Sequence, residues 1–323
     1  MGTDQTNLQK SQPSFMQAVA FDDFENFAST TKEWDIDFRQ LDRGPFSAEV
    51  KQAFIGSTQF SHAKLNRIMD QRGNPPKNHF TFAIMSGSSL LSWHKHIIPD
   101  YFIILYAPGS EIDCVSQPGF HVFTFSQTET QIAEAMHSLE LPEPRQVLGN
   151  TAVLACSRTR WERLNQAFHR LDQMLFSNPS GPYNSHIYES FDELQRLLLT
   201  SFTSTQLPKH RSSSSKNKRT ITRVMDYIDV NKREPLTVRD LCGIAGVTER
   251  ALEYSFDKHF GISPKTYLKT IRLNYVHREL QKADPAETKI SNVANSYGFW
   301  HMGDFAADYR SLFGELPSKT LRK

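Results

Sequence analysis

The spacing of hydrophobic residues divides the chain into a strand-forming part and helix-forming parts. Between residues 34 and 128, aromatic and β-branched residues concentrate in HFTFAIM (79–85), YFIILYA (101–107) and FHVFTFS (120–126). Such runs predict strands. Turn-forming stretches such as QRGNPPKN and APGS separate them. This part of the chain therefore predicts an antiparallel β-barrel or sandwich.

A helical periodicity replaces this pattern over residues 158–203. Apolar residues recur at intervals of three and four, as in the a/d seam of a coiled coil. The members of the seam are Trp161, Leu164, Phe168, Leu171 and Leu175, and a second amphipathic stretch contains Phe191, Leu194 and Leu198. Two interpretations stay open: the seam forms a dimer interface, or the helices pack on the β-rich part.

A change of composition marks the boundary between two predicted domains. LPKHRSSSSKNKR (207–219) is polar, Ser-rich and basic, which is typical of a flexible linker. We therefore expect an N-terminal sensor and dimerisation domain over residues 1–206. The apolar spacing after the linker is helical throughout, so an all-helical domain is expected over residues 220–323.

This C-terminal domain contains an internal repeat. FGISP (260–264) returns as FGELP (313–317), and the apolar positions before each copy correspond at offsets of 52 and 53 residues. Each unit has a short apolar-spaced helix, a glycine turn and a second helix, which is the signature of a helix-turn-helix. Trp300 stands beside the second glycine turn, and we expect it to brace that turn.

One long helix is predicted between the two units. PKTYLKTIRLNYVHRELQKA (264–283) carries apolar residues at helical spacing, and a proline is tolerated in the first turn. A helix of this length spans about 30 Å, close to one DNA turn of about 34 Å. The sequence therefore predicts two DNA-reading helices on one rigid spacer.

The charge distribution supports a polyanionic partner for the C-terminal part. Residues 209–323 hold 21 Lys and Arg against 13 Asp and Glu, a balance of +8, and the other 208 residues hold 16 against 22, a balance of −6, which gives the total of +2. A basic module is typical of nucleic-acid binding. The three cysteines of the chain have no CxxC spacing, which favours a reducing compartment. No run of apolar residues is long enough to predict a membrane span, so we expect a cytoplasmic protein.

The residues of the two units resemble a known family. LTVRDLCGIAGVTERALEYSFDKHFGISPKTYLKTIRLN and ISNVANSYGFWHMGDFAADYRSLFGELPSKTL resemble the DNA-binding domain of AraC/XylS regulators, and GFWHMGDFAADYRSLF resembles the ethanolamine-operon subgroup. The resemblance implies a bacterial activator or dual regulator of transcription that binds promoter DNA as a homodimer and contacts RNA polymerase. It also implies a cupin-like N-terminal barrel that senses a small molecule.

The first unit is expected to read base edges. With Leu252, Phe256 and Phe260 facing inward, the outward residues are Thr248, Glu249, Arg250, Glu253, Tyr254 and Asp257. The resemblance places base contacts on Arg250, Glu253 and Tyr254. Arg250 suits guanine and Glu253 suits the cytosine amino group, although Glu253 also fits a role in repelling phosphate.

The second unit is poorer in polar readers. Its candidate contacts are His301, Met302, Gly303, Asp304 and Ala307. Ala and Met can touch a thymine methyl group but cannot bond to a base edge. We therefore expect this unit to supply affinity and modest specificity, with Lys289 and Arg310 contacting phosphates.

The N-terminal part offers weaker candidates. Phe82, Trp93, Tyr101 and Ile103 could line a ligand pocket, or they could equally be core residues. His94 and His96 form an H-x-H pair without the carboxylate that a cupin metal site needs, so no metal and no cofactor is expected. No P-loop, G-x-S-x-G, H-E-x-x-H or G-x-G-x-x-G motif occurs, and we do not expect an enzyme.

These observations predict an α+β protein with a β-rich sensor domain and a double helix-turn-helix domain. The predicted function is sequence-specific regulation of transcription. Two alternatives are a metal-dependent cupin enzyme fused to a DNA-binding module, and a regulator that needs no ligand and is controlled by a protein partner.

Overall fold

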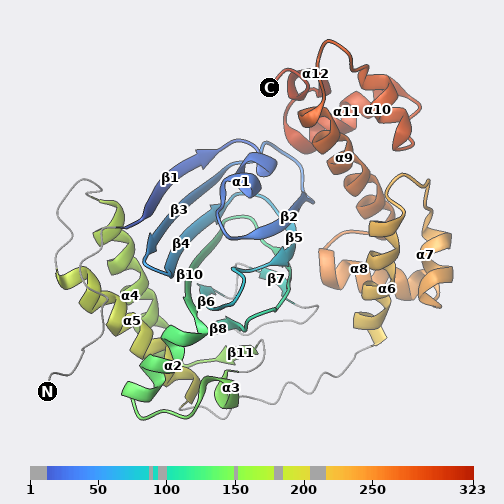
Figure 1. Cartoon of the computed structure of the whole chain (residues 1–323). Helices are drawn as coiled ribbons and strands as arrows, with labels where there is room; N and C mark the ends of the chain where they lie inside the picture. Colours follow the sequence, from blue (N-terminus) through green and yellow to red (C-terminus); the bar gives the residue numbers. More distant parts are fainter. Residues whose placement is uncertain (1–12, 87–89, 94–99, 149–151, 178–184, 204–215) are drawn as a thin grey trace, which may run out of the picture.

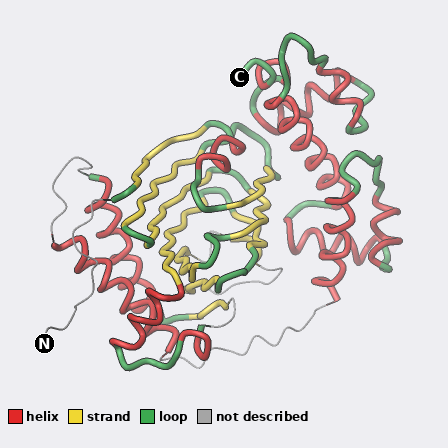
Figure 2. The backbone as a smooth tube through the Cα atoms, viewed as in Figure 1, coloured by secondary structure: helices red, strands yellow, loops and turns green. Residues whose placement is uncertain are grey.

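The computed structural model describes residues 13–86, 90–93, 100–148, 152–177, 185–203 and 216–323 (Figure 1). A β-rich N-terminal domain precedes a helical C-terminal domain. Figure 2 shows the strands gathered in one body, with helices of the N-terminal domain on one side and the C-terminal helices on the other. This two-domain arrangement agrees with the expected one.

Two antiparallel sheets form the N-terminal domain. The larger has the order β1-β3-β4-β10-β6-β8-β11 and the smaller has the order β2-β5-β9-β7. The strands of the larger sheet are β1 (Phe15–Phe21), β3 (Ala48–Ile55), β4 (Thr58–Leu65), β10 (Phe120–Thr128), β6 (His79–Ser86), β8 (Tyr101–Tyr106) and β11 (Ala152–Ala155). Those of the smaller are β2 (Asp35–Gln40), β5 (Met69–Asn74), β9 (Ile112–Ser116) and β7 (Leu90–Trp93).

The expected cupin-like barrel is not closed. Closure requires a ladder of backbone hydrogen bonds between edge strands, and no described strand of one sheet pairs with a strand of the other. The two sheets instead face each other across an apolar core. Gly73 shows how tightly β2 and β5 approach: a Cβ there would lie 1.8 Å from the carbonyl oxygen of Asp35. Only glycine, with φ of 148° at this position, fits.

Strand alternation gives the larger sheet two apolar faces. One face meets the smaller sheet, where α1 (Phe24–Thr30) also packs. The other face is covered by helices and carries residues such as Phe60 and Phe125. The covering helices are α2 (Glu129–Ser138), α3 (Pro144–Val147), α4 (Arg158–Phe176) and α5 (Ser185–Thr203).

The a/d seam of α4 faces this sheet. Leu164, Phe168, Leu171 and Leu175 are buried in the chain's own core, and Trp161 packs partly buried against the same cluster. This placement corresponds to the second interpretation, in which the helices pack on the β-rich part. Four of the five seam residues are therefore covered within the chain itself, and the expectation of a dimer through the seam does not fit the structure.

Seven helices of the C-terminal domain follow the predicted pattern. They are α6 (Lys216–Val230), α7 (Val238–Ala245), α8 (Glu249–Phe260), α9 (Pro264–Lys282), α10 (Ile290–Ser296), α11 (Met302–Phe313) and α12 (Pro317–Thr320). The first helix begins at Lys216, inside the segment predicted as a linker, and the linker residues 207–215 lie outside the described residues. The long helix α9 ends within one residue of the predicted position.

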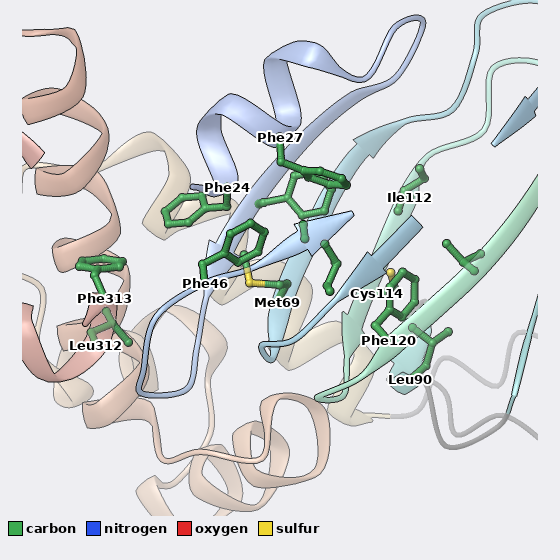
Figure 3. Close-up of a cluster of buried hydrophobic side chains, with 14 of the residues drawn as sticks. Phe24, Phe27, Phe46, Met69, Leu90, Ile112, Cys114, Phe120, Leu312 and Phe313 are labelled. Atoms are coloured by element: carbon green, nitrogen blue, oxygen red, sulfur yellow. The ribbon is translucent and has the colours of Figure 1, made fainter. Parts of the chain in front are cut away.

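One apolar core continues from the N-terminal domain into the C-terminal domain. Phe24 of α1 and Phe313 of α11 lie across from each other (Figure 3), with ring centroids 6.1 Å apart. The ring of His277 on α9 stacks on both, at 5.0 Å from Phe24 and 4.4 Å from Phe313. The two domains therefore share buried surface instead of being joined only through the linker.

Candidate nucleic-acid interface

The first helix-turn-helix is built by local signals in the sequence. Thr237 caps α7 through a capping box with Asp240, and α7 ends at Gly246, whose φ of 64° lies in the left-handed region that glycine adopts without strain. Thr248 caps α8 by accepting a hydrogen bond from the amide of Ala251. These caps fix where α8 begins.

The predicted reading residues of α8 form one exposed stripe. Leu252, Phe256 and Phe260 are fully buried behind it. The exposed members are Thr248, Glu249, Arg250, Glu253, Tyr254 and Asp257. Tyr254 keeps 58% of its surface exposed. An aromatic side chain that is so exposed on a helix is available for a partner. The spacing of apolar residues in the sequence had already predicted this exposed stripe.

The second unit repeats the arrangement with fewer capping interactions. Phe305, Tyr309 and Phe313 are buried, and no side chain caps α11 at His301. Among the predicted contacts His301, Gly303, Asp304 and Ala307 are exposed, and Met302 is half-buried. The phosphate candidates Lys289 and Arg310 are also exposed.

Trp300 differs from its expected role. Its side chain is 72% exposed, so it does not brace the turn before α11. The turn is formed instead by Gly298, with φ of 81°, and by Phe299, whose ring packs on Phe305 at 5.2 Å. A large apolar residue beside a turn is expected to be buried there. In the structure, the side chain of Trp300 instead belongs to the exposed surface.

The N-terminal domain holds α8 and α11, the two helices predicted to read DNA, by their C-terminal ends. The hydroxyl of Ser92 on β7 donates to the carbonyl of His259 at the end of α8, at 3.1 Å. The amide of Gly44 and the side chain of Gln40 donate to the carbonyl of Leu312 near the end of α11, at 3.0 and 2.7 Å. The last carbonyls of a helix lack partners within the helix. These contacts satisfy them while leaving the N-terminal halves, which carry the residues predicted to read DNA, uncovered.

A buried group of charges joins β2 and β5 to the helical domain. The carboxylate of Asp70 is fully buried. It accepts from Tyr267 Oη of α9 at 2.9 Å and from Arg72 Nε at 3.1 Å. Arg39, 3% exposed, lies 4.0 Å from Asp70 and donates to Asp229 of α6 at 2.6 Å. Burial raises the pKa of Tyr267, and the neighbouring Asp70 raises it further, so this phenol is a neutral donor.

A histidine–carboxylate pair holds the middle of α9. His277 Nε2 lies 2.9 Å from Asp23 Oδ2, and His277 Nδ1 lies 2.7 Å from the hydroxyl of Tyr309. Burial would raise the pKa of Asp23, but hydrogen bonds from His277 and Gln281 hold it well below its usual range. A carboxylate with a lowered pKa stabilises the folded state above its unfolded pKa, and this contribution is lost as the pH falls toward its folded pKa.

Asn274 acts as an extra partner for the edge strand β2. Its Oδ1 accepts from the amide of Gln40, and its Nδ2 donates to the carbonyl of Gln40, both at 2.9 Å. Both residues are fully buried. Without this side chain, two backbone groups at the end of β2 would lie buried and unpaired.

Asn274→Ala is therefore expected to lower the free energy of unfolding by about 1–3 kcal/mol for each group left unpaired. Urea unfolding of the whole chain would measure the loss. Asn292→Ala, at an exposed position on α10, is the matched control, with an expected change within about 0.5 kcal/mol. Equal effects of the two substitutions would show that Asn274 does not hold β2.

A small apolar cavity of about 80 Å³ lies between the two sheets. Among the described residues, no charged side chain lines it. The polar groups on its wall come from Thr31, Trp34, Ser61, Gln71, Tyr106, Cys114 and Thr124. Such a wall suits an uncharged ligand, since a charged group would lose its hydration without gaining a partner.

The four residues expected at a pocket lie elsewhere. Phe82 and Ile103 are buried on the opposite face of the sheet, in the cluster covered by α4 and α5. Tyr101 contacts Trp161 of α4, at 5.6 Å between rings. Trp93 is buried in the core between the sheets and donates to Tyr106, but it does not line the cavity. Their placement agrees with the alternative that they are core residues.

His94 and His96, weighed for metal binding, lie outside the described residues. Among the described residues, no group of three or more His, Cys, Asp or Glu side chains is arranged so that it could hold a metal ion. Within the same residues, no helix has the length and apolar character needed to cross a membrane.

Comparisons with known proteins concern mainly the C-terminal domain. Residues 241–323 match the family described as "Helix-turn-helix domain". The "Probable thc operon regulatory protein" of Rhodococcus erythropolis is 37% identical over 98 residues, which cover 30% of each chain. The "XylDLEGF operon transcriptional activator 1" of Pseudomonas putida is 35% identical over 113 residues, covering 35% of this chain and 34% of the relative. The chain thus spans about a third of the length of these relatives.

Two solved structures are also similar to this chain. A probable AraC family transcriptional regulator from Rhodopseudomonas palustris is 36% identical and covers 32% of this chain and 94% of its own, with a TM-score of 0.30. ToxT from Vibrio cholerae covers 90% of this chain and 98% of its own at 13% identity, with a TM-score of 0.31. Scores this low carry no argument about how the two domains are placed. The sequence matches place a helix-turn-helix domain at residues 241–323.

Proposed function

We propose that this chain is a sequence-specific DNA-binding transcription regulator of the AraC/XylS type, and that it acts as an activator. The observation that carries the proposal is the duplicated helix-turn-helix, in which both reading helices expose their N-terminal halves. The relatives matched over this region are named as regulators of transcription, which favours this function over a cupin-type enzyme. The finer assignment to the ethanolamine-operon subgroup is supported only by the resemblance of residues 298–313.

The spacing of the two units fits one face of a DNA duplex. Helix α9 has 19 residues and a length of about 28 Å, and successive major grooves on one face of DNA are about 34 Å apart. In the proposed complex Arg250 reads a guanine and Glu253 a cytosine, because their donor and acceptor atoms match those base edges. Lys289 and Arg310 contact phosphates and add affinity without specificity.

The same strands that line the cavity also hold the helical domain. On β2, Ile36 and Phe38 face the cavity, and the alternate residues Asp37 and Arg39 bind residues of α9 and α6. On β5, Gln71 faces the cavity and Asp70 on the other side binds Tyr267. A ligand that displaces β2 or β5 would therefore move residues that hold α9.

We infer that β2 and β5 transmit the binding of an effector to the helical domain, because alternate residues of these strands face the cavity and hold α9 and α6. The bound effector would be a small, uncharged and mainly apolar molecule, as the cavity wall requires. Binding would change how the two reading helices are held at their C-terminal ends, and hence how well both fit adjacent grooves. Control by a protein partner, without a ligand, is the alternative that the same contacts would also serve.

The proposed function is tested by genome-wide capture of DNA with the purified full-length protein at stated salt. The expected result is a motif of two half-elements about one helical turn apart. Broad binding that depends steeply on salt and shows no motif would contradict specific recognition. The expected partners are promoter DNA, RNA polymerase and a second copy of the chain, in the bacterial cytoplasm, and the homodimer would use surfaces other than the a/d seam of α4.

Filling the cavity provides a test of the sensor role. Ala83 on β6 lines the cavity, so Ala83→Leu should occupy most of its volume at a cost of about 1–3 kcal/mol in stability. We expect the variant to bind DNA but to lose any change of DNA affinity caused by small apolar effectors, measured by titration of labelled DNA. Ile84→Val, on the opposite face of the same strand, is the control. An effector response that survives Ala83→Leu would exclude the cavity as the sensor.

A further inference from the structure

We propose that Trp300 contacts the DNA backbone in the second helix-turn-helix unit. In this contact the indole ring packs on a deoxyribose at the edge of the major groove, and its Nε1–H group donates a hydrogen bond to a phosphate oxygen. The inference rests on the proposed function, because it requires a chain that binds DNA. It adds to that function a residue outside α8 and α11 that contributes affinity without sequence preference.

Trp300 differs from the other three tryptophans of the chain in its exposure. Its side chain is 72% exposed. Trp93 and Trp161 each donate a hydrogen bond within the N-terminal domain, and Trp34 lines the cavity. Leaving a large apolar ring in water forgoes the free energy that its burial would release, and tryptophan is enriched at positions that a binding partner covers. The exposure therefore indicates a contact outside the chain.

Trp300 is the residue by which the second unit exceeds the first. Phe299 corresponds to Val247 at an offset of 52 residues. The next landmark, the N-cap of each second helix, is Thr248 in the first unit and His301 in the second, an offset of 53. The second turn thus has one additional residue, which is Trp300. The first unit forms its turn without such a residue, so the side chain of Trp300 is not needed to build the motif.

The position of Trp300 is at the border of the predicted DNA-reading surface. Phe299 before it packs inward on Phe305, with ring centroids 5.2 Å apart, and the exposed His301 after it begins α11. Consecutive Cα atoms are about 3.8 Å apart, so Trp300 lies within about 8 Å of Met302. In a helix-turn-helix the N-terminal residues of the second helix enter the major groove, and the sugar-phosphate backbone borders this groove. The residue just before that helix is therefore placed at the backbone.

The chemistry of an indole fits this location. Its faces are apolar and suit the C–H groups of a deoxyribose, and its single polar group is a donor, which suits a phosphate oxygen. A contact with the backbone carries no direct sequence information. It would supply the affinity expected of the second unit, whose helix has few side chains able to bond to a base edge. Since the indole has no charge, the contact releases no counterion, unlike the expected phosphate contacts of Lys289 and Arg310.

The first measurement is a titration of two labelled duplexes, the preferred site and an unrelated sequence, at several salt concentrations. Trp300→Ala should weaken binding to both about tenfold, the factor that corresponds to a hydrogen bond with a charged group. The slope of affinity against salt should stay unchanged, whereas Arg310→Ala should reduce it by about one. Trp300→Phe keeps an apolar ring without the donor and should fall between wild type and Trp300→Ala.

Leu316→Ala is the matched control for loss of an exposed apolar side chain. Leu316 is 45% exposed and lies beyond the C-terminal end of α11, at the end opposite Trp300. We expect this variant to bind both duplexes as the wild type does. Far-ultraviolet circular dichroism checks that each variant folds.

The second measurement is acrylamide quenching of the tryptophan fluorescence of the full wild-type chain, with and without the preferred duplex. We expect DNA to shield the most accessible tryptophan, and we expect this accessible component to be missing in Trp300→Phe. Because the wild-type chain gives the main signal, the inference stays testable even if Trp300→Ala does not fold.

The outcomes separate this inference from the proposed function. If the wild-type chain binds its preferred site while Trp300→Ala binds equally well, or while acrylamide quenching is the same with and without DNA, the contact is excluded and the proposed function stands. A changed ranking of sequences in Trp300→Ala would contradict a backbone contact. Shielding that requires RNA polymerase would assign Trp300 to a protein contact instead. If the wild-type chain binds no duplex at all, the proposed function fails, and the Trp300 contact fails with it.

Discussion

Asp70→Ala will lower the free energy of unfolding by about 3–5 kcal/mol, the usual cost of removing one partner from a buried charge group. Asp70 is fully buried, and its carboxylate is the acceptor for Arg72 and Tyr267. Its removal leaves the guanidinium of Arg72 and the nearby Arg39 buried with less compensating charge. Because Tyr267 belongs to α9, we also expect the helical domain to be held less firmly. Urea unfolding of the full chain measures the first effect, and protease susceptibility of the domain junction measures the second.

Tyr267→Phe measures the contribution of one hydrogen bond to Asp70 while the buried charges stay in place. This substitution removes one hydroxyl and keeps the ring that packs against Phe256 and Phe260. The expected loss is about 0.5–1.5 kcal/mol, well below that of Asp70→Ala. If Asp70→Ala cost no more than Tyr267→Phe, the two arginines would not depend on Asp70, and the buried charges would not be what joins the domains.

Arg250→Ala will weaken binding to the preferred DNA site about 10–100-fold. A bidentate contact between arginine and guanine contributes about 1–3 kcal/mol of discrimination, and Arg250 is exposed at the start of α8. We also expect relaxed preference at the base pair that it reads, because the remaining contacts do not distinguish the bases there. Affinities for the preferred site and for its single-base variants, measured at one salt concentration, give both effects.

Arg322→Ala is the matched control for charge. Arg322 is exposed beyond α12 and outside both reading helices, so its loss should weaken binding to all sequences alike, if at all, and leave their ranking unchanged. An unchanged sequence preference in Arg250→Ala, together with a relaxed preference in His301→Ala, would show that the second unit reads the DNA and that the roles of the two units are reversed.

The helix-turn-helix units could be predicted because the interactions that define them are local. The capping residues Thr237 and Thr248 lie within three residues of the amides that they bind. The left-handed turns fall on Gly246 and Gly261, where the sequence has the one residue type that adopts them without strain. The apolar spacing then decides which side of α8 is buried, and so which side is free to read DNA.

The partner of an amphipathic surface could not be predicted in the same way. The seam of α4 has the same periodicity whether it packs on a second chain or on a sheet of its own chain, since both remove the same apolar surface from water. Phe82 and Ile103 present the same difficulty on strands. Both faces of the larger sheet are apolar, so alternation alone does not tell which face lines the cavity.

Only the tertiary structure joins residues that are far apart in the chain. Tyr267 and Asp70 are separated by 197 positions, Asn274 and Gln40 by 234, and His277 and Asp23 by 254. No local propensity encodes such pairs. The sequence by itself therefore determined the double helix-turn-helix and the exposed residues that are predicted to read DNA. The open pair of sheets, the cavity and the contacts that hold the ends of α8 and α11 depend on how distant segments pack, because each contact arises only when the strands and helices have taken their places.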